Sequence, residues 1–143
     1  GTFLDLGCGY GPIAAVLATE SPDAAAVAVD VNERSLDLCR HNAAALDLDN
    51  IEVHDPDAGE AAVDGYGSLD LIWSNPPIRV GKTVLHQLLE RWLAHLGEDG
   101  EAVLVVNRHL GADSLQTWLG TQGFPTERLA SRRGYRLLHA VRG

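Results

Sequence analysis

Short apolar runs and helical patterns alternate along this chain, and no other feature restricts its fold as strongly. Apolar runs of strand length occupy residues 2–6, 24–30, 51–54, 69–74 and 101–107. Helical spacing of apolar residues follows in segments 33–46, 83–96 and 111–123. Near-continuous apolar strands are typical of parallel sheets that are covered on both faces. The sequence therefore predicts an α/β fold with a doubly wound, mostly parallel sheet.

The connecting segments complete this predicted sheet. Residues 55–68 are polar and rich in glycine, so a loop is expected there, and residues 97–100 are expected to form a turn. Residues 124–130 and 135–141 flank Ser-Arg-Arg-Gly, which predicts a C-terminal antiparallel hairpin and a seven-stranded sheet.

The length of the chain predicts one domain over residues 1–143. Because the sequence starts abruptly inside its first predicted strand, an N-terminal segment is expected to be missing. No apolar run approaches the roughly 20 residues that a membrane-spanning helix needs. A membrane protein is therefore not expected.

The cysteines and histidines argue against a metal site. Cys8 and Cys39 lack metal-ligand spacing, and the six histidines form no HxH or HxxxH pair. We expect no metal. The two cysteines favour a reducing, cytoplasmic setting.

The charge of the chain, formally −9, is distributed unevenly. Residues 1–70 contain 14 Asp and Glu against two arginines, a balance of −12. Residues 71–143 contain six acids against nine Lys and Arg, a balance of +3. The two halves face different partners, or the first half carries more solvated acids.

A glycine-rich turn joins the first predicted strand to a helix. Gly7, Gly9 and Gly11 lie in the string LDLGCGYG, and Asp30 ends the second predicted strand. Glycines let a ligand lie against the backbone, and a strand-end acid can accept hydrogen bonds from ribose hydroxyls. A dinucleotide site would show GxGxxG, whereas the last glycine here comes one residue early. Asp5 would be unfavourable beside a pyrophosphate, but it suits a cationic ligand such as S-adenosylmethionine.

The strings LDLGCGYG and VAVD resemble motifs I and II of class I S-adenosylmethionine-dependent methyltransferases. The resemblance implies that Gly7 and Gly9 pack against the methionine part of the cofactor. It also implies that Asp5 orients the methionine amine, directly or through water, and that Asp30 holds the ribose. The cofactor-binding residues expected from this resemblance are Asp5, Gly7, Cys8, Gly9, Gly11, Asp30, Val31, Asp57 and Asn75.

Asp57 matches the position at which the class I enzymes place an acid on the adenine amino group. Asp55 is the competing residue, and a solvated turn around Pro56 is the structural alternative for both acids. The three-residue string Gly81-Lys82-Thr83 is not a phosphate loop, because Pro76 occupies the place of the first required glycine.

The segment Asn75-Pro76-Pro77 follows the fourth predicted strand. Prolines stiffen the loop and keep the preceding residues extended. The Asn75 side-chain oxygen and the Pro76 backbone oxygen would then be two fixed acceptors for the hydrogens of one NH2 group. Such a pair favours a pyramidal nitrogen and frees its lone pair for methyl transfer. We predict that Asn75, Pro76 and Pro77 form the catalytic loop.

The string NPPIRVGK resembles motif IV of methyltransferases that modify exocyclic or amide nitrogens. Together with VLH, LVV, LGADSLQTWL and GYRLL, it is similar to the small methyltransferase (MTS) domain family, which is related to ribosomal RNA guanine-N2 methyltransferases. Ile78 stands where adenine- and glutamine-modifying relatives usually have an aromatic residue. Arg79 and Lys82 are candidate substrate-binding residues with Ile78, or else solvated loop charges.

The resemblance implies an N-methyltransferase whose cofactor is S-adenosylmethionine and whose substrate is RNA, most directly guanine N2 of ribosomal RNA. The alternatives are a glutamine or small-molecule N-methyltransferase, an NAD(P)-dependent oxidoreductase and a non-catalytic module that binds the cofactor. Trp73, Trp92 and Trp118 are expected in the core.

Overall fold

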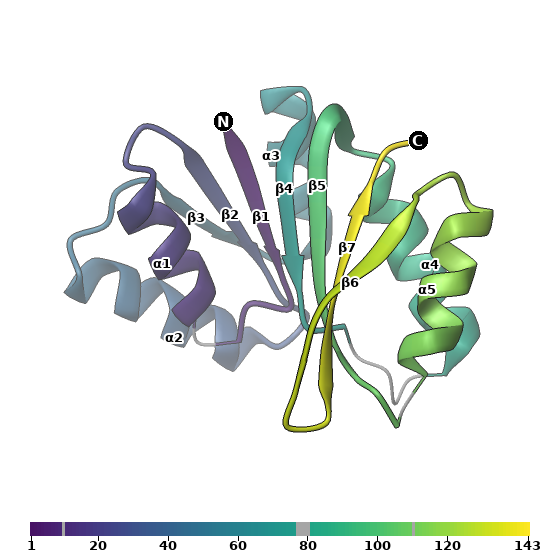
Figure 1. Ribbon diagram of the computed structural model, residues 1–143. Coiled ribbons are helices and arrows are strands. Elements are labelled where there is room, and N and C mark those ends of the chain that lie inside the picture. Colours follow the sequence, from purple (N-terminus) through teal and green to yellow (C-terminus); the bar gives the residue numbers. More distant parts are fainter. Residues whose placement is uncertain (10, 77–80, 110) are drawn as a thin grey trace.

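The computed structural model describes residues 1–9, 11–76, 81–109 and 111–143, with only the backbone of Arg132 (Figure 1). Seven strands form one sheet in the order β3-β2-β1-β4-β5-β7-β6. The strands are β1 (Thr2–Leu6), β2 (Ala25–Val29), β3 (Ile51–His54), β4 (Leu69–Ser74), β5 (Leu96–Asn107), β6 (Thr126–Arg132) and β7 (Tyr135–Val141). The helices in the described ranges are α1 (Pro12–Glu20), α2 (Glu33–Ala45), α3 (Pro56–Tyr66), α4 (Lys82–Leu93) and α5 (Ala112–Thr121).

The topology places one crevice in the parallel part of the sheet. Strand β1 pairs in parallel with both β2 and β4, whereas β7 pairs in antiparallel fashion with β5 and β6. The chain runs outward from β1 to β3 and then returns to β4 on the other side of β1. Ligands of open α/β sheets bind beyond the carboxyl ends of the strands at such a reversal. The predicted doubly wound sheet with a C-terminal hairpin is therefore confirmed.

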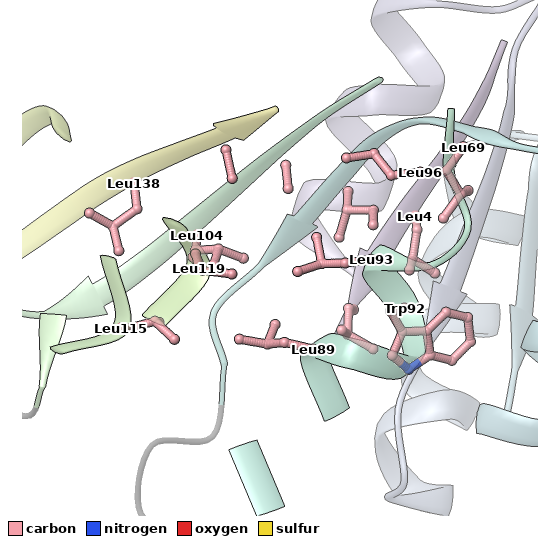
Figure 2. Packing of buried hydrophobic residues seen from close by; sticks show 14 of the residues in the cluster. Leu4, Leu69, Leu89, Trp92, Leu93, Leu96, Leu104, Leu115, Leu119 and Leu138 are labelled. Atoms are coloured by element: carbon pink, nitrogen blue, oxygen red, sulfur yellow. The ribbon is translucent and has the colours of Figure 1, made fainter. Parts of the chain in front are cut away.

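Two clusters of buried residues form the core. The larger one joins the sheet to α3, α4 and α5, and Figure 2 shows Leu89, Trp92 and Leu93 of α4 packed near Leu4 and Leu69. The smaller one contains Cys8, Ala14, Ala28, Leu36 and Cys39, and it lies between the sheet, α1 and α2. Helices thus pack on the sheet from both sides, as the apolar strands predicted.

The prediction of a loop over residues 55–68 is wrong, because α3 forms there. The side chain of Asp55 caps the helix by accepting a hydrogen bond from the Ala58 N–H at 2.9 Å, and Pro56 occupies the first turn. A Cβ atom on Gly59 would lie 2.5 Å from Cγ2 of Val29. This glycine therefore serves the close packing of α3 on β2, and it does not mark a turn.

The prediction of a turn at residues 97–100 is also wrong. Helix α4 ends at Leu93, and β5 begins at Leu96, which pairs with Leu69 of β4. A Cβ atom on Gly100 would lie 2.7 Å from the carbonyl oxygen of Leu69. Glycine is needed there because the two backbones approach closely, at a place where the register of the two strands shifts.

Candidate active site

The glycine loop connects β1 to α1, and the structure describes its residues 7–9 and 11. The N–H groups of Gly7 and Cys8 both donate to the carbonyl oxygen of Val29, at 2.8 and 3.0 Å. Gly7, Gly9 and Gly11 have φ values of 78°, 57° and 92°. These are left-handed conformations that residues other than glycine rarely adopt. The backbone conformation of the loop therefore requires these glycines, and the hydrogen bonds to Val29 of β2 hold the loop in place.

Two carboxylates lie beneath and beside this loop. Asp5 is 4% exposed, and its Oδ2 accepts a hydrogen bond from the Ala14 N–H at 3.0 Å. Burial raises the pKa of Asp5 to about 6; the Ala14 bond lowers it, and the neighbouring charge of Asp30 adds to the rise. Asp30 is half-buried, and its Oδ2 accepts a hydrogen bond from the Gly9 N–H at 2.9 Å. The structure thus brings together two acids that lie 25 positions apart in the sequence.

A cavity of about 290 Å³ opens beyond the carboxyl ends of β1, β2 and β4. Its lining residues are Leu6, Gly7, Val29, Asp30, Val31, Pro56, Ser74, Asn75, Leu88 and Trp92. Four of them, Gly7, Asp30, Val31 and Asn75, are residues that the sequence predicted to bind the cofactor. Side chains from distant segments therefore converge on the crevice at the strand reversal.

Other predicted residues lie outside the lining of this cavity. Cys8 is buried against the smaller core cluster, and a hydrogen bond with Cys39, together with burial, raises the pKa of the Cys8 thiol. The side chain of Asp57 is 96% exposed, and its Oδ1 pairs with Nη2 of Arg91 at 2.9 Å. Asp55 caps α3. The assignment of Asp57 to the adenine amino group stays a prediction.

The predicted catalytic loop begins beside the glycine loop. Asn75 is exposed, and within the described ranges its side chain has no hydrogen-bond partner. A Cβ atom on Gly7 would lie 3.8 Å from the Asn75 carbonyl oxygen, so the two loops are close neighbours. Pro76 is buried, and Lys82 is the exposed first residue of α4. Pro77, Ile78 and Arg79 lie outside the described residues, and their roles stay predictions.

Trp92 is a site residue that the sequence analysis placed in the core without a functional role. Its side chain is fully buried, it lines the cavity, and its Nε1 has no hydrogen-bond partner in the part of the chain that the structure describes. Its place among leucines on one face of α4 gives no signal of this contact. The wall of the cavity thus includes a residue of the larger core cluster.

Among the described residues, no group of three or more His, Cys, Asp or Glu side chains is arranged to hold a metal ion. No helix in the same residues combines the length and apolar character that crossing a membrane requires.

Comparisons with known proteins agree with this geometry. The profile of the family "Methyltransferase small domain" matches residues 1–139. The chain is 34% identical over 140 residues to YbxB of Bacillus subtilis, covering 98% of this chain and 69% of YbxB. It is 36% identical over 148 residues to ribosomal RNA small subunit methyltransferase C of Stutzerimonas stutzeri, covering all of this chain and 42% of that protein.

Solved structures show the same fold. The 16S rRNA N2 G1207 methyltransferase RsmC of Thermus thermophilus, in complex with AdoMet and guanosine, superposes with a TM-score of 0.78 at 27% identity. That match covers 99% of this chain and 37% of RsmC. TrmN of T. thermophilus gives a TM-score of 0.80 at 26% identity, covering 99% of this chain and 44% of TrmN. The chain thus spans less than half the length of these proteins.

These findings agree with the motifs at the ends of β1, β2 and β4, and they favour a methyltransferase over the oxidoreductase alternative. The chain belongs to the methyltransferase small domain family, a family of S-adenosylmethionine-dependent methyltransferases with the class I fold.

Proposed function

We propose that this domain transfers a methyl group from S-adenosylmethionine to an exocyclic amino group of RNA, most directly guanine N2 of ribosomal RNA. The observation that carries the proposal is the position of Asn75. Its side chain, which has no hydrogen-bond partner among the residues that the structure describes, follows β4 and lines the same cavity as Gly7 and Asp30. The similarity to RsmC, which acts on guanine N2 of 16S rRNA, supports the choice of substrate.

The cavity suits the chemistry of the proposed donor. Asp5 and Asp30 place negative charge beneath the glycine loop, which favours a ligand with ammonium and sulfonium groups. Each oxygen of Asp30 accepts one backbone N–H, from Gly9 or Asn32, and keeps a lone pair for a ribose hydroxyl. The apolar walls include Val31, which can cover a purine ring.

The reacting amine needs activation, because its lone pair is delocalised into the purine ring. The Asn75 side-chain oxygen and the Pro76 carbonyl oxygen would accept its two N–H bonds, which holds the nitrogen in place and favours a pyramidal geometry. When bound, the donor supplies an electrophilic methyl group on sulfur. The amine nitrogen would form a bond to this methyl carbon as the carbon–sulfur bond breaks, so that S-adenosylhomocysteine leaves and one proton passes from the nitrogen to solvent. Preorganised acceptors are most effective where positive charge develops on the nitrogen.

Cations that follow β4 and β5 or lie in the β6–β7 turn support an RNA substrate. Lys82 begins α4 directly after the catalytic loop, and Arg108 follows β5. The N–H of Arg108 donates to the carbonyl oxygen of Gly134 at 2.8 Å, which joins this segment to the tip of the β6–β7 hairpin. Arg133 lies in the turn between β6 and β7. The tip of this hairpin extends at the same edge of the sheet (Figure 1). Within the described ranges, Lys82, Arg108 and Arg133 have no acidic partner, so they are available to phosphates.

The proposal is tested by incubating the protein with labelled S-adenosylmethionine and a cell extract, and then separating RNA from protein. Label in RNA that digests to N2-methylguanosine supports it. Label in the protein fraction would favour the glutamine alternative, and binding of the cofactor without transfer would favour a non-catalytic module.

Variants of Asn75 test the catalytic role directly. Asn75→Ala removes one acceptor, so we expect transfer to be abolished while the Kd for the cofactor stays within a few-fold. Asn75→Asp is the matched control, because it keeps an acceptor oxygen at that place and should retain part of the activity. Full activity of Asn75→Ala would remove the proposed role.

A further inference from the structure

The two cysteines of the chain meet in the smaller core cluster. Cys8 lies in the glycine loop and is 4% exposed, whereas Cys39 lies in α2 and is 2% exposed. Both are free thiols, and both belong to the cluster between the sheet, α1 and α2. The fold thus brings together two sulfur-bearing side chains from distant segments, and one of them is part of the loop that the sequence predicts to bind the cofactor.

Two contacts join Cys39 to the glycine loop. The Cys39 thiol shares a hydrogen bond with the Cys8 thiol. Sγ of Cys39 also lies against Gly11, because a Cβ atom on this glycine would be 2.5 Å from it. The Gly11 N–H donates to the Cys8 carbonyl oxygen at 2.9 Å, so Cys8 and Gly11 are the two ends of one tight turn. Cys39 therefore contacts both ends of this turn.

Helix α2 is the fixed side of the pair. Its buried residues are Leu36, Cys39 and Ala43. Their spacing of three and four positions puts them on one face, so the packing of the whole helix holds the Cys39 side chain. The glycine loop is outside the ladders of the sheet and the helices, and a few backbone hydrogen bonds hold it. A covalent bond between the two sulfur atoms would therefore move the loop more than the helix.

We propose that hydrogen peroxide converts Cys8 and Cys39 into a disulfide, and that this bond lowers the affinity of the glycine loop for S-adenosylmethionine. The inference rests on the proposed function, because it takes this loop as part of the cofactor site. In reducing compartments, the disulfides that form are usually transient ones that respond to oxidants. A disulfide in this loop would make methyl transfer sensitive to such an oxidant.

The two thiols have different roles in the reaction. The hydrogen bond with Cys8 lowers the pKa of the Cys39 thiol, so Cys39 ionises first and attacks the peroxide. One peroxide oxygen joins the Cys39 sulfur as a sulfenic acid, the O–O bond breaks, and the other oxygen leaves as water with the thiol proton. The Cys8 sulfur then attacks the Cys39 sulfur, the S–O bond breaks, and a second water leaves with the Cys8 proton. Two thiols and one peroxide thus give one disulfide and two waters.

The length of the new bond explains its effect on binding. A disulfide holds its sulfur atoms about 2.05 Å apart, much closer than two hydrogen-bonded thiols, so Cys8 must move toward α2. The Cys8 N–H donates to the Val29 carbonyl oxygen at 3.0 Å, and the neighbouring Gly9 N–H donates to Oδ2 of Asp30 at 2.9 Å. Movement of Cys8 strains both bonds and displaces the backbone against which the ligand would lie.

The first test asks whether the bond forms. Protein treated with hydrogen peroxide is unfolded, alkylated with iodoacetamide and weighed by mass spectrometry. The disulfide removes two hydrogen atoms and leaves neither cysteine open to alkylation, and a protease digest should join the peptides that contain Cys8 and Cys39. The chain has no methionine, so its two cysteines are its only sulfur-containing residues. Two alkylated cysteines, or sulfinic acids without a cross-link, would overturn the proposal.

The second test measures the Kd for S-adenosylhomocysteine by calorimetry after the peroxide has been removed. We expect the oxidised wild type to bind roughly tenfold or more weakly than the reduced wild type, and dithiothreitol to restore the affinity. Cys39→Ala is the matched control, because it keeps Cys8 in the loop but cannot form the bond. Its Kd should be the same before and after peroxide, and an equal loss in this variant would contradict the proposal.

A third measurement uses the wild type alone. In a glutathione redox buffer, saturating S-adenosylhomocysteine should lower the equilibrium constant for disulfide formation by the same factor by which the disulfide weakens binding, because the two effects are linked. Equal affinities of the reduced and disulfide forms, with no shift of this equilibrium, would refute the inference but leave the proposed function intact. No binding by the reduced protein would overturn both.

Discussion

The substitution Asp5→Asn should stabilise the ligand-free domain and weaken its binding of the cofactor. Asp5 is 4% exposed, and burial raises its pKa from 3.8 to about 6. Asparagine has nearly the same shape, and its side-chain oxygen can still accept the hydrogen bond from the Ala14 N–H. The substitution therefore removes the cost of burying a charge and keeps the contact at the start of α1.

The size of the effect follows from the pKa. A rise from 3.8 to about 6 means that folding disfavours the charged form by ~3 kcal/mol. Because the folded protein holds this proton more tightly than the unfolded chain, the stability due to Asp5 is greatest below pH 3.8. It falls as the pH rises toward 6 and stays low above that value. The advantage of Asp5→Asn over the wild type should grow from ~1.5 kcal/mol at pH 5 to ~3 kcal/mol at pH 7.

The assay is urea unfolding of both proteins between pH 5 and pH 8, without cofactor. If the amide hydrogens of the new asparagine stay unpaired, they lower the gain in unfolding free energy by a constant amount. The pH dependence of that gain is unchanged. Asp37→Asn is the control, because it makes the same change of charge at an exposed residue of α2 that pairs with Arg40 at 3.3 Å. Its unfolding free energy should stay within about 0.5 kcal/mol of the wild type at each pH.

A second measurement, the Kd for the cofactor, tests whether the same carboxylate holds the methionine amine. Because the ligand's ammonium group loses its charged partner, the affinity of Asp5→Asn for S-adenosylmethionine should be ~10- to 100-fold lower than that of the wild type at pH 7. The reasoning is refuted if the stability difference between Asp5→Asn and the wild type is the same at pH 5 and pH 7. Unchanged affinity in Asp5→Asn would remove Asp5 from the cofactor site.

Three other substitutions test the loop, the ribose site and the packing of α1. Gly11→Ala should lower the unfolding free energy by about 2–5 kcal/mol, because φ is 92° and the new Cβ atom would lie 2.5 Å from Sγ of Cys39. Adding Cys39→Ala should restore only part of that loss in urea unfolding, and complete recovery would show that backbone strain is absent. Asp30→Ala should raise the Kd for S-adenosylmethionine more than ~10-fold in calorimetry, with retained affinity contradicting the ribose assignment. Asn50→Ala removes an amide that donates to three backbone carbonyls at 3.1–3.2 Å, so the unfolding free energy should fall by about 1–3 kcal/mol. An unchanged urea midpoint would show that these bonds do not contribute.

The sequence by itself determined the architecture and the elements that carry the chemistry. Continuous apolar runs of strand length indicate buried strands. In a sheet that is covered on both faces, side chains on both sides of each strand are buried, so successive residues are apolar. The glycine loop and Asp30 could be recognised from local spacing, because both are defined by the end of a strand. The expected hairpin is present as β6 and β7.

Glycines misled the prediction wherever their role depends on a distant neighbour. Gly59 lies inside α3 because the helix touches Val29 of β2, and Gly100 lies inside β5 because the strand touches Leu69 of β4. In a single sequence, each of these glycines only lowers the predicted tendency to form a helix or strand. The backbone or side chain that requires a glycine there comes from another segment, so the sequence does not reveal it.

Only the tertiary structure decided which buried and acidic residues belong to the site. The helical pattern of α4 predicted that Trp92 is buried, but the spacing of apolar residues is the same for a core side chain and for one that lines a cavity. Asp57 follows β3 as the resemblance expects, yet Arg91 of α4 pairs with its carboxylate. Spacing along the chain fixes which face of an element a residue occupies, whereas the partner of that face is set by how the elements pack.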